Sequence, residues 1–288
     1  MNKNIVKTAR RCIISASKYA ILVTGCLLVI LPLVVLLFGS LKNSNDYRMT
    51  NVFSFPTNPE WGNYVEAFIG GNVLRGLLNT GIILVIACTG TVLIGTMTAF
   101  VVQRFPTILT SAVKWAFLVA ALVPSITMQI TVYQIIQGID ATLAFLPNIM
   151  NSMAAPIILY IGTDIISIYI FIHYLENIPV SLDESAIIDG ASYFRVFRSI
   201  IIPLLQPAIA TVVVIKFISI YNDFYIPNLY MRDTPVISTA LYKFIGPYGA
   251  RWEVIFAGVV ICLIPSLIIF LVLQKFIYAN ITAGSVRG

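Results

Sequence analysis

The residues best suited to bind a polar solute form two small sets in an otherwise apolar chain. The later set is Tyr221, Asn222, Asp223 and Tyr225, and the earlier set is Gln129, Tyr133 and Gln134. Both sets combine aromatic rings with amide or carboxylate groups. Sugars are typically held by aromatic faces together with planar hydrogen-bonding groups, so both sets have the chemistry of a sugar-binding site.

Groups that could support enzymatic or metal chemistry are sparse. His173 is the only histidine, and the four cysteines form no C-x-x-C pair. One histidine with scattered carboxylates gives neither a Ser/His/Asp set nor a cluster of metal ligands. The run GTVLIGTM at residues 90–97 has no lysine after its second glycine, so it is not a phosphate-binding loop. We expect no enzyme active site, bound cofactor or metal in this chain.

The elements that position these residues must be membrane helices. The 288 residues are 59% hydrophobic and 10% charged, whereas about a quarter of a soluble protein is charged. Apolar runs of roughly 20 residues recur, and in lipid such runs must be helical to satisfy their backbone groups. We predict an all-α membrane protein with a single transmembrane domain over residues 1–288. Its six spans are expected at about 19–41, 77–102, 112–136, 154–175, 203–226 and 253–277.

The Lys and Arg residues orient these spans. Five of them precede the first span: Lys3, Lys7, Arg10, Arg11 and Lys18. Because such residues concentrate in cytoplasmic segments, we expect the N-terminus inside, and six spans then return the C-terminus to the same side. This topology accounts for the net charge of +6 without a nucleic-acid partner. It leaves a segment of about residues 177–202 in the cytoplasm and two long loops, about 42–76 and 227–252, outside.

Three charged residues, Asp164, Lys216 and Asp223, fall within the predicted spans. Charge inside a membrane is costly unless it is paired or hydrated, so such residues are functional candidates by default. Asp164 and Lys216 could form a structural pair or contact the solute, and both interpretations stay open here. The aromatic residues near Asp223 could equally form a belt at the membrane interface.

The cytoplasmic segment has the pattern of two helices joined by a turn. Ser181 and Glu184 have the spacing of a capping box, and Gly190 suits the end of the first helix. The second helix is expected to begin near Ser192 and to run toward Pro203. Its apolar face would hold Tyr193, Phe194 and Phe197, and its polar face Arg195 and Arg198. This element must dock on the membrane surface, on its own bundle or on another protein, and these residues alone leave the three options open.

The same segment resembles the E-A-A loop of the membrane subunits of ATP-binding-cassette (ABC) importers, written E-A-A-x3-G-x9-I-x-L-P. The corresponding positions are Glu184, Ser185, Ala186, Gly190, Ile200, Ile202 and Pro203, with Ser185 and Ile202 as conservative departures. The stretches IPVSLDESAIIDGAS, PLLQPAIATVVV, YNDFYIPNLYM and QKFIYANITAGSVRG are also similar to maltose-type, binding-protein-dependent carbohydrate permeases. The similarity is to the smaller maltose permease subunit and covers most of residues 176–288. Tyr221 departs from that family, which usually has Trp there.

The resemblance implies a type I ABC importer fold with six transmembrane helices and a cytoplasmic coupling helix. In the family this helix sits in a groove of a nucleotide-binding subunit, whose closure reorients the spans. The coupling residues carried over are Glu184, Ser185, Ala186, Asp189, Gly190, Ala191, Phe194, Arg195, Ile200 and Pro203. We expect the solute path at Tyr221, Asn222, Asp223, Tyr225, Gln129 and Tyr133.

The resemblance also implies partners, because this chain supplies no ATP site. They are a homodimeric nucleotide-binding ATPase that binds ATP and Mg²⁺, a second, non-identical permease subunit and an extracytoplasmic solute-binding protein. The expected solute is a sugar, in particular an oligosaccharide, and the expected location is the bacterial inner membrane. By the same resemblance, the loop with Thr234, Tyr242 and Lys243 reaches toward the binding protein. The tail with Gly284, Ser285 and Arg287 approaches the ATPase.

Two alternatives remain at this stage. The solute could be of another kind, such as a polyamine or a phosphate ester, because the sugar assignment depends on the tail and on the surroundings of Asn222 and Asp223. The chain could also be a stand-alone secondary carrier, although such a carrier has no need of an E-A-A loop.

Overall fold

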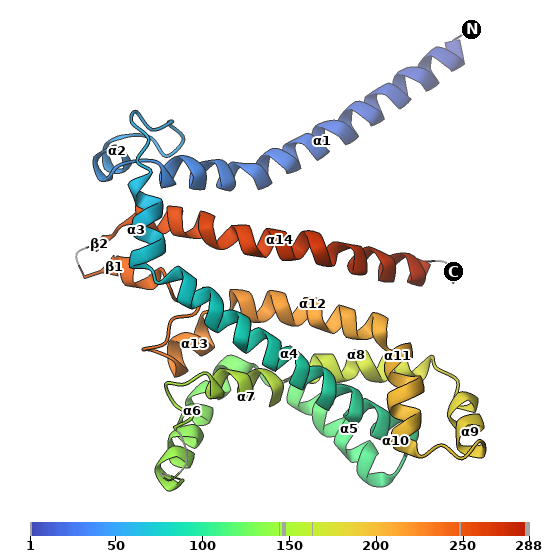
Figure 1. The fold of residues 1–288 in the computed structure, drawn as a ribbon. Helices are drawn as coiled ribbons and strands as arrows, with labels where there is room; N and C mark the ends of the chain where they lie inside the picture. The colour runs from blue at the N-terminus through green and yellow to red at the C-terminus, as the bar shows by residue number, and fades with distance from the viewer. Residues whose placement is uncertain (1, 144, 146–147, 163, 248, 286–288) are drawn as a thin grey trace. The chain divides into compact units, whose positions relative to one another are not determined.

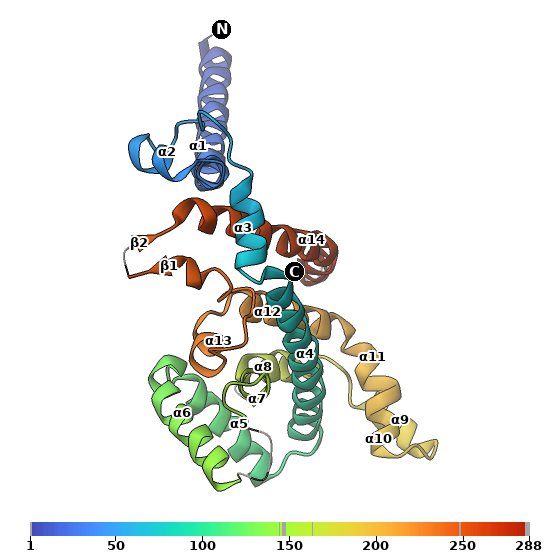
Figure 2. The same cartoon turned by 60° about the vertical axis from the view of Figure 1, so that its left-hand side comes forward.

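The computed structural model of the chain describes residues 2–143, 145, 148–162, 164–247 and 249–285. The chain divides into two compact units, which are drawn in Figures 1 and 2. One unit comprises Met1–Gly71 and Leu241–Ile264, and the other comprises Asn72–Ala240 and Pro265–Gly288. Arg287, expected near an ATPase partner, lies outside the described residues.

The first unit combines one long helix with short elements. It holds α1 (Asn2–Ser40), α2 (Ser44–Met49), α3 (Gly62–Gly70), a 3-10 turn (Tyr242–Phe244), β1 (Ile245–Gly246), β2 (Gly249–Ala250) and the start of α14 (Trp252–Ser285). The two strands pair antiparallel, with Ile245 opposite Ala250. Ala67 of α3 packs against Val254 and Ala257 of α14 in a small buried core.

Buried polar side chains order the segment that follows α1. The side chain of Lys42 is buried, and its Nζ donates to Thr50 Oγ1 (2.9 Å), Asn51 O (2.6 Å) and Ser54 Oγ (3.0 Å). Asn63 Nδ2 donates to the carbonyl oxygens of Ser40 and Lys42 at 3.0 and 2.8 Å. These bonds occupy carbonyl groups that the end of a helix leaves open. The predicted outer loop at about 42–76 therefore contains ordered structure.

The second unit is a bundle of helices that holds the segment of interest. In chain order its elements are α4 (Val73–Arg104), α5 (Ile108–Ala121), α6 (Ser125–Thr142), α7 (Ala154–Gly162), α8 (Ile165–Glu176), α9 (Ser181–Ile188), α10 (Tyr193–Val196), a π-helical turn (Phe197–Ile201), α11 (Ile202–Leu204), α12 (Gln206–Asn222) and α13 (Tyr225–Tyr230).

Helix α4 is central to this bundle and packs against α7, α8 and α12. Its buried face includes the small residues Ala87, Thr91, Gly95 and Ala99. A Cβ atom placed on Gly95 would lie 3.0 Å from the ring of Phe171, so the absence of a side chain allows α8 to approach closely.

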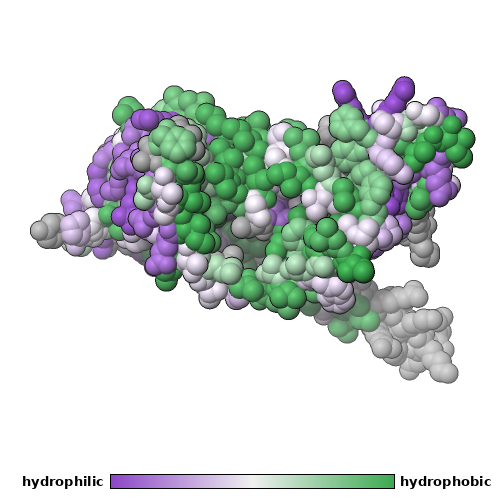
Figure 3. Space-filling model, turned by 90° about the horizontal axis from the view of Figure 1, so that it is seen from below, coloured by the Kyte–Doolittle hydropathy of each residue, from purple (hydrophilic) through white to green (hydrophobic). Residues whose placement is uncertain are grey.

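The described helices provide four to six membrane spans. Among the residues that the structure describes, four stretches are long and apolar enough to cross a membrane: Ile13–Ser40, Val73–Arg104, Ala154–Glu176 and Trp252–Val272. Two helix pairs pass the same test together, Ile108–Ala121 with Ile126–Thr142 and Tyr193–Leu204 with Gln206–Asn222. Counting each pair as one span gives six, the predicted number. The second pair begins at Tyr193 and so includes α10, which the sequence places in the cytoplasmic segment, and it bends by 70° instead of forming the single helix predicted at about 203–226. In the face shown in Figure 3, apolar side chains cover much of the surface, as lipid-facing helices require.

The third predicted span, about 112–136, is wrong as a single helix. The chain instead breaks between α5 and α6, and the two helices are bent by 112°. Pro124 sits at the start of α6 with ψ of 123°, which is extended rather than helical backbone. A proline supplies no N–H and disfavours helical backbone in the preceding residue, so one straight helix cannot continue through this position.

Candidate functional site

The polar segment folds as two helices with a sharp turn between them. Gly190 has a φ of +86°, and its N–H donates to Ile187 O at 2.9 Å. The next N–H, that of Ala191, donates to Ala186 O, also at 2.9 Å. Ser192 Oγ accepts from the N–H of Arg195 at 3.4 Å and caps α10. The predicted end of the first helix and the predicted start of the second are both confirmed.

The capping box predicted for Ser181 and Glu184 is wrong. The residue before α9 is Val180, which already has helical backbone angles and makes no side-chain cap. The N–H groups of Leu182 and Asp183 donate to the carbonyls of Pro179 and Val180 instead. Ser181 therefore lies inside the first turn rather than before it, and its side chain cannot reach the open N–H groups.

The two acidic residues of the first turn of α9 have different surroundings. Glu184 is exposed, whereas Asp183 is buried and pairs with Arg104 at the end of α4. Arg104 Nε lies 2.6 Å from Asp183 Oδ2, and Arg104 Nη2 donates to Ile178 O at 2.9 Å. Arg104 is not among the site residues predicted from the sequence. The sequence signal that could have indicated this pair is a basic residue at the end of an apolar run together with a carboxylate near the start of a helix.

The prediction that Tyr193, Phe194 and Phe197 share one apolar face is wrong for Phe194. Phe197 is buried against Phe100, with ring centroids 5.3 Å apart, but Phe194 is 66% exposed. In a projection down the helix axis, the side that faces the core lies midway between the side chains of Val196 and Phe197. At about 100° per residue, Phe194 is roughly 110° away from that direction and faces outward. Tyr193 is partly covered by Phe105, with ring centroids 5.0 Å apart.

The coupling residues carried over from the resemblance fall into an exposed and a packed group. The exposed ones are Glu184, Ser185, Asp189, Gly190, Phe194, Arg195 and Pro203. Ala186, Ala191 and Ile200 are half-buried and pack against the core of the bundle. Leu182 and Ile188 of α9 add exposed apolar surface, 43% and 85% exposed. The segment thus presents a mixed apolar and polar surface outward while its other side is anchored.

Asp164 and Lys216 form an ion pair inside the bundle. Lys216 Nζ lies 2.9 Å from Asp164 Oδ2 and donates to the carbonyl oxygen of Tyr160 at 2.5 Å. Asp164 also caps α8 by accepting from the N–H and the hydroxyl of Ser167, at 3.2 and 2.5 Å. Lys216 of α12 therefore joins the last turn of α7 to the first turn of α8. Of the two roles considered for Asp164 and Lys216, a structural ion pair or contact with the solute, the geometry supports the structural pair.

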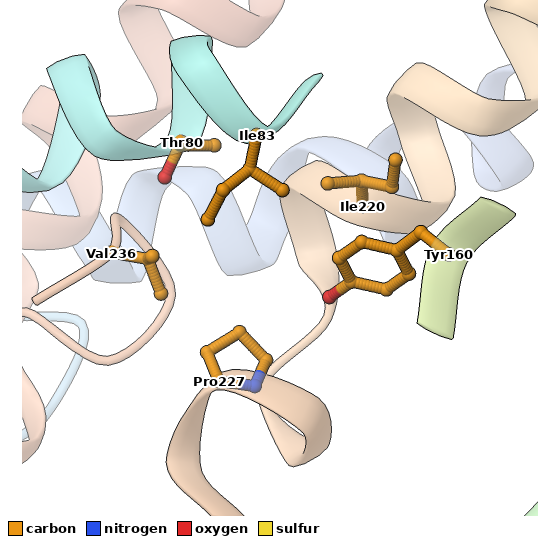
Figure 4. Close-up of a pocket in the computed structure, with 6 residues that line it drawn as sticks. All are labelled: Thr80, Ile83, Tyr160, Ile220, Pro227 and Val236. Carbon is orange, nitrogen blue, oxygen red and sulfur yellow. The ribbon is translucent and has the colours of Figure 1, made fainter. Parts of the chain in front are cut away.

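Asp223 is also engaged by neighbouring groups. Its Oδ2 accepts from the hydroxyl of Tyr160 at 2.9 Å, and its Oδ1 accepts from the N–H of Tyr225 at 2.8 Å at the start of α13. A small pocket lies beside this contact, and Figure 4 shows the Tyr160 ring at its edge. Its lining is Thr80, Ile83, Tyr160, Ile220, Pro227 and Val236. The lining is mostly apolar and contains none of the predicted solute-path residues.

The predicted solute-path residues lie around α13. Tyr221 is buried and stacks on Phe217, with ring centroids 5.4 Å apart, while Tyr225 is 71% exposed. Asn222 is exposed, and its Nδ2 donates to Ile218 O at 2.9 Å.

Two residues of the earlier set, Gln129 and Tyr133, contact Tyr230, which is the last residue of α13. Tyr230 donates to Gln129 Oε1 at 3.1 Å, and its ring lies 5.8 Å from that of Tyr133. Burial and the neighbouring Tyr133 raise the pKa of Tyr230, so its hydroxyl stays a donor. Helix α13 thus contacts both sets of candidate residues.

The loop after α13 is fastened to the start of α4 by residues that sequence reasoning missed. Asn79 Nδ2 donates to Pro235 O at 2.7 Å, and Thr80 Oγ1 accepts from the N–H of Ile237 at 3.0 Å. A Cβ atom on Gly76 would lie 3.1 Å from the backbone of Val236. Small and polar residues at positions i, i+3 and i+4 of an apolar helix were the available signal.

Thr80→Val is expected to loosen this loop. Valine has nearly the same shape but cannot accept the buried N–H of Ile237, and an unsatisfied buried donor costs about 1–3 kcal/mol. Hydrogen exchange of residues 231–240 should accelerate by roughly 5- to 150-fold. Thr91→Val on the same helix is the control, because Thr91 Oγ1 is buried without a hydrogen-bond partner among the described residues. Equal exchange in both variants would contradict the role of Thr80.

Comparisons with known proteins identify the chain's relatives. A family described as the inner membrane component of binding-protein-dependent transport systems matches residues 91–282. The chain is 28% identical over 266 residues to the melibiose/raffinose/stachyose import permease protein of Bacillus subtilis, which covers 90% of this chain and 91% of that protein. It is 29% identical over 286 residues to the galactooligosaccharides transport system permease protein of the same organism, covering 97% and 98%.

A solved structure has the same fold. It is a bacterial ABC transporter involved in the import of the acidic polysaccharide alginate, and the superposition covers 91% of this chain and 96% of that chain. The TM-score is 0.76 at 18% sequence identity. This likeness confirms the predicted all-α fold of an ABC importer permease. The family match includes the whole of the segment at 177–202, and the chain therefore belongs to the inner membrane components of binding-protein-dependent transport systems.

Proposed function

We propose that this chain is the permease subunit of an ABC importer that carries an oligosaccharide across the bacterial inner membrane. The observation that carries the proposal is the segment from α9 to α11, which is fixed to the bundle on one side and exposes apolar and charged residues on the other. The names of two relatives, which import melibiose, raffinose and stachyose or galactooligosaccharides, support a sugar as the solute. As a member of its family, the chain is a transport component of the inner membrane and not an enzyme.

We propose that α9 docks on a homodimeric nucleotide-binding ATPase in the cytoplasm. Leu182, Ile188 and Phe194 offer an apolar surface for a groove, and Glu184 is free of the capping bond that the sequence suggested. In this arrangement both termini of the chain lie in the cytoplasm. ATP and Mg²⁺ bind to the partner, and this chain contributes no ligand to them.

Two further partners belong to the proposal. A second, non-identical permease subunit completes the path across the membrane, and an extracytoplasmic binding protein delivers the sugar. The family description supports a binding protein in general, because it names transport systems that depend on one. The kinds of partner and their number in the complex are part of the proposal.

We place the solute path at the exposed residues around α13. Asn222 and Tyr225 are exposed there, so an amide and an aromatic ring are available to a sugar. Gln129 and Tyr133 approach the same helix through Tyr230. Tyr221 and Asp223 hold this arrangement in place, through the stack on Phe217 and the cap of α13.

Asn222→Ala is expected to lower sugar uptake roughly three- to ten-fold, the equivalent of one lost hydrogen bond, without lowering assembly of the complex. Uptake into proteoliposomes and recovery of the purified complex measure the two effects. Thr211→Ala is the matched control, because Thr211 Oγ1 donates to Pro207 O at 2.9 Å on the same helix, the same kind of backbone contact that Asn222 makes. If both variants transport alike, Asn222 is not on the path.

The sugar assignment is tested with the complete transporter in proteoliposomes loaded with Mg-ATP. Labelled raffinose, stachyose and a galactooligosaccharide are offered one at a time, with putrescine and glycerol 3-phosphate as representatives of the alternative solutes. ATP-dependent uptake of at least one sugar is the expected result. Uptake of putrescine or glycerol 3-phosphate but of none of the sugars would overturn the assignment.

A further inference from the structure

Helix α4 is fastened both to the coupling segment and to the loop after α13. At its last residue, Arg104 pairs with Asp183 of α9 at 2.6 Å. Near its first residues, Asn79 and Thr80 hold the loop through Pro235 and Ile237. Figure 1 shows α4 running from beside α13 to beside α10.

The helix between these two attachments is unbroken. It has 32 residues and no proline, and Thr80 and Arg104 are about 36 Å apart at 1.5 Å per residue. The two bent helix pairs, with angles of 112° and 70°, contain breaks at which a displacement can be absorbed. A continuous helix packed along its length against α7, α8 and α12 has no such break.

The Arg104–Asp183 contact is well shielded from solvent. The two side chains are 7% and 8% exposed. Neither carboxylate oxygen of Asp183 has a hydrogen-bond partner among the described residues, so the interaction is an ion pair rather than an aligned hydrogen bond. Salt screens a buried pair much less than an exposed one. Asp183 therefore depends on Arg104 for compensation of its charge.

An aromatic contact reinforces the same end of α4. Phe105, the residue after Arg104, packs edge-to-face on Tyr193 of α10 with centroids 5.0 Å apart. Phe105 also packs on Phe100, which in turn contacts Phe197. Both helices of the coupling segment, α9 and α10, are thus attached to the consecutive residues Arg104 and Phe105.

We infer that α4 transmits the displacement of the coupling segment to the loop at residues 231–240, and that Arg104 and Phe105 are the joint at which the displacement enters. The inference rests on the proposed function, because it assumes that an ATPase moves α9. Arg104 is a positioning residue in this scheme, since it acts through Asp183 and contacts no solute. Movement of α9 carries the end of α4 with it, and Asn79 and Thr80 pass the movement to the loop.

The test uses spin labels in the complete transporter, in a background without the four native cysteines. One pair of labels, at Val101 and Ser181, reports the distance between α4 and α9, and a single label at Arg232 reports the mobility of the loop. All three positions are exposed. Spectra are recorded without nucleotide and with Mg-ATP and vanadate. With the native joint, the distance should stay the same in both states while the mobility at Arg232 changes.

The variant Arg104→Met with Asp183→Asn removes both charges and leaves neither one buried alone. We expect its Val101–Ser181 distance distribution to become at least twice as wide and the change at Arg232 to disappear. The exchange Arg104→Asp with Asp183→Arg should restore both signals if it folds. Lys114→Gln, which breaks the exposed pair of Lys114 with Glu176 at 3.5 Å, is the control and should behave like the native chain.

Two results would overturn the inference. One is a native distance that changes on addition of Mg-ATP and vanadate, and the other is a neutral double variant that keeps both native signals. Failure of an ATPase subunit to purify with the native chain is a different result and counts against the proposed function itself.

Discussion

Replacing Gly190 by valine is expected to separate ATP hydrolysis from sugar uptake while the protein still inserts into the membrane. Gly190 has a φ of +86°, a region that L-residues avoid and that β-branched residues avoid most strongly. Apart from the two neighbouring residues in the chain, no atom of the described residues lies within 4 Å of the position of a Cβ at Gly190, so the effect would arise from the backbone and not from a clash. The turn would open, and α9 would lose its orientation. Uptake into proteoliposomes should fall at least ten-fold, while ATP hydrolysis continues.

Gly190→Asn is the matched control for this prediction. Asparagine adopts left-handed backbone angles far more readily than valine, so the turn should survive and transport should remain near its native rate. The account of Gly190 fails if the two variants lose uptake to the same extent, because a backbone requirement must distinguish them.

Lys216→Met is expected to destabilise the bundle strongly. It would leave Asp164 buried without its partner and the carbonyl of Tyr160 without its donor. Removing one member of a buried ion pair typically costs about 3–5 kcal/mol. The measurement is thermal unfolding of the purified protein in detergent, which should occur at a clearly lower temperature than in the native chain.

A second substitution distinguishes a lost pair from a simple packing defect. Combining Lys216→Met with Asp164→Asn removes the orphaned charge and should recover much of the lost stability. Lys114→Met breaks an exposed pair and should change stability by about 0–1 kcal/mol. If the double variant is no more stable than Lys216→Met alone, the ion pair is not what stabilises the junction of α7 and α8.

The features predicted correctly from the sequence are those set by local chemistry. Long apolar runs have one structural solution in lipid, so the four unbroken spans followed from length and composition, whereas the bends in the other two did not. Gly190 and Ser192 marked the turn because glycine and serine have specific roles at helix ends. The same local rules failed at Ser181, because Pro179 and Val180 start the helical turn one residue earlier than the S-x-x-E pattern suggests.

The features that could not be predicted depend on residues far apart in the chain. Arg104 and Asp183 are separated by 79 positions, and Thr80 and Ile237 by 157. Either residue of each pair has an ordinary explanation when taken alone, as a cytoplasmic charge or as a polar residue near a helix end. Only the packing of α4 shows that each residue needs its partner. The Asp164–Lys216 pair was foreseen as one of two options because two opposite charges inside a membrane must be compensated.

The central claim is that the segment from α9 to α11 docks on an ATPase, and affinity purification in mild detergent followed by mass spectrometry tests it most directly. The account predicts that a nucleotide-binding subunit and one other permease are recovered with this chain. It also predicts that Ile188→Asp, which places a charge on the exposed apolar side chain of α9, reduces recovery of the nucleotide-binding subunit but not of the second permease. Recovery of this chain alone, in a preparation that still moves solute, would contradict the account and indicate a stand-alone carrier.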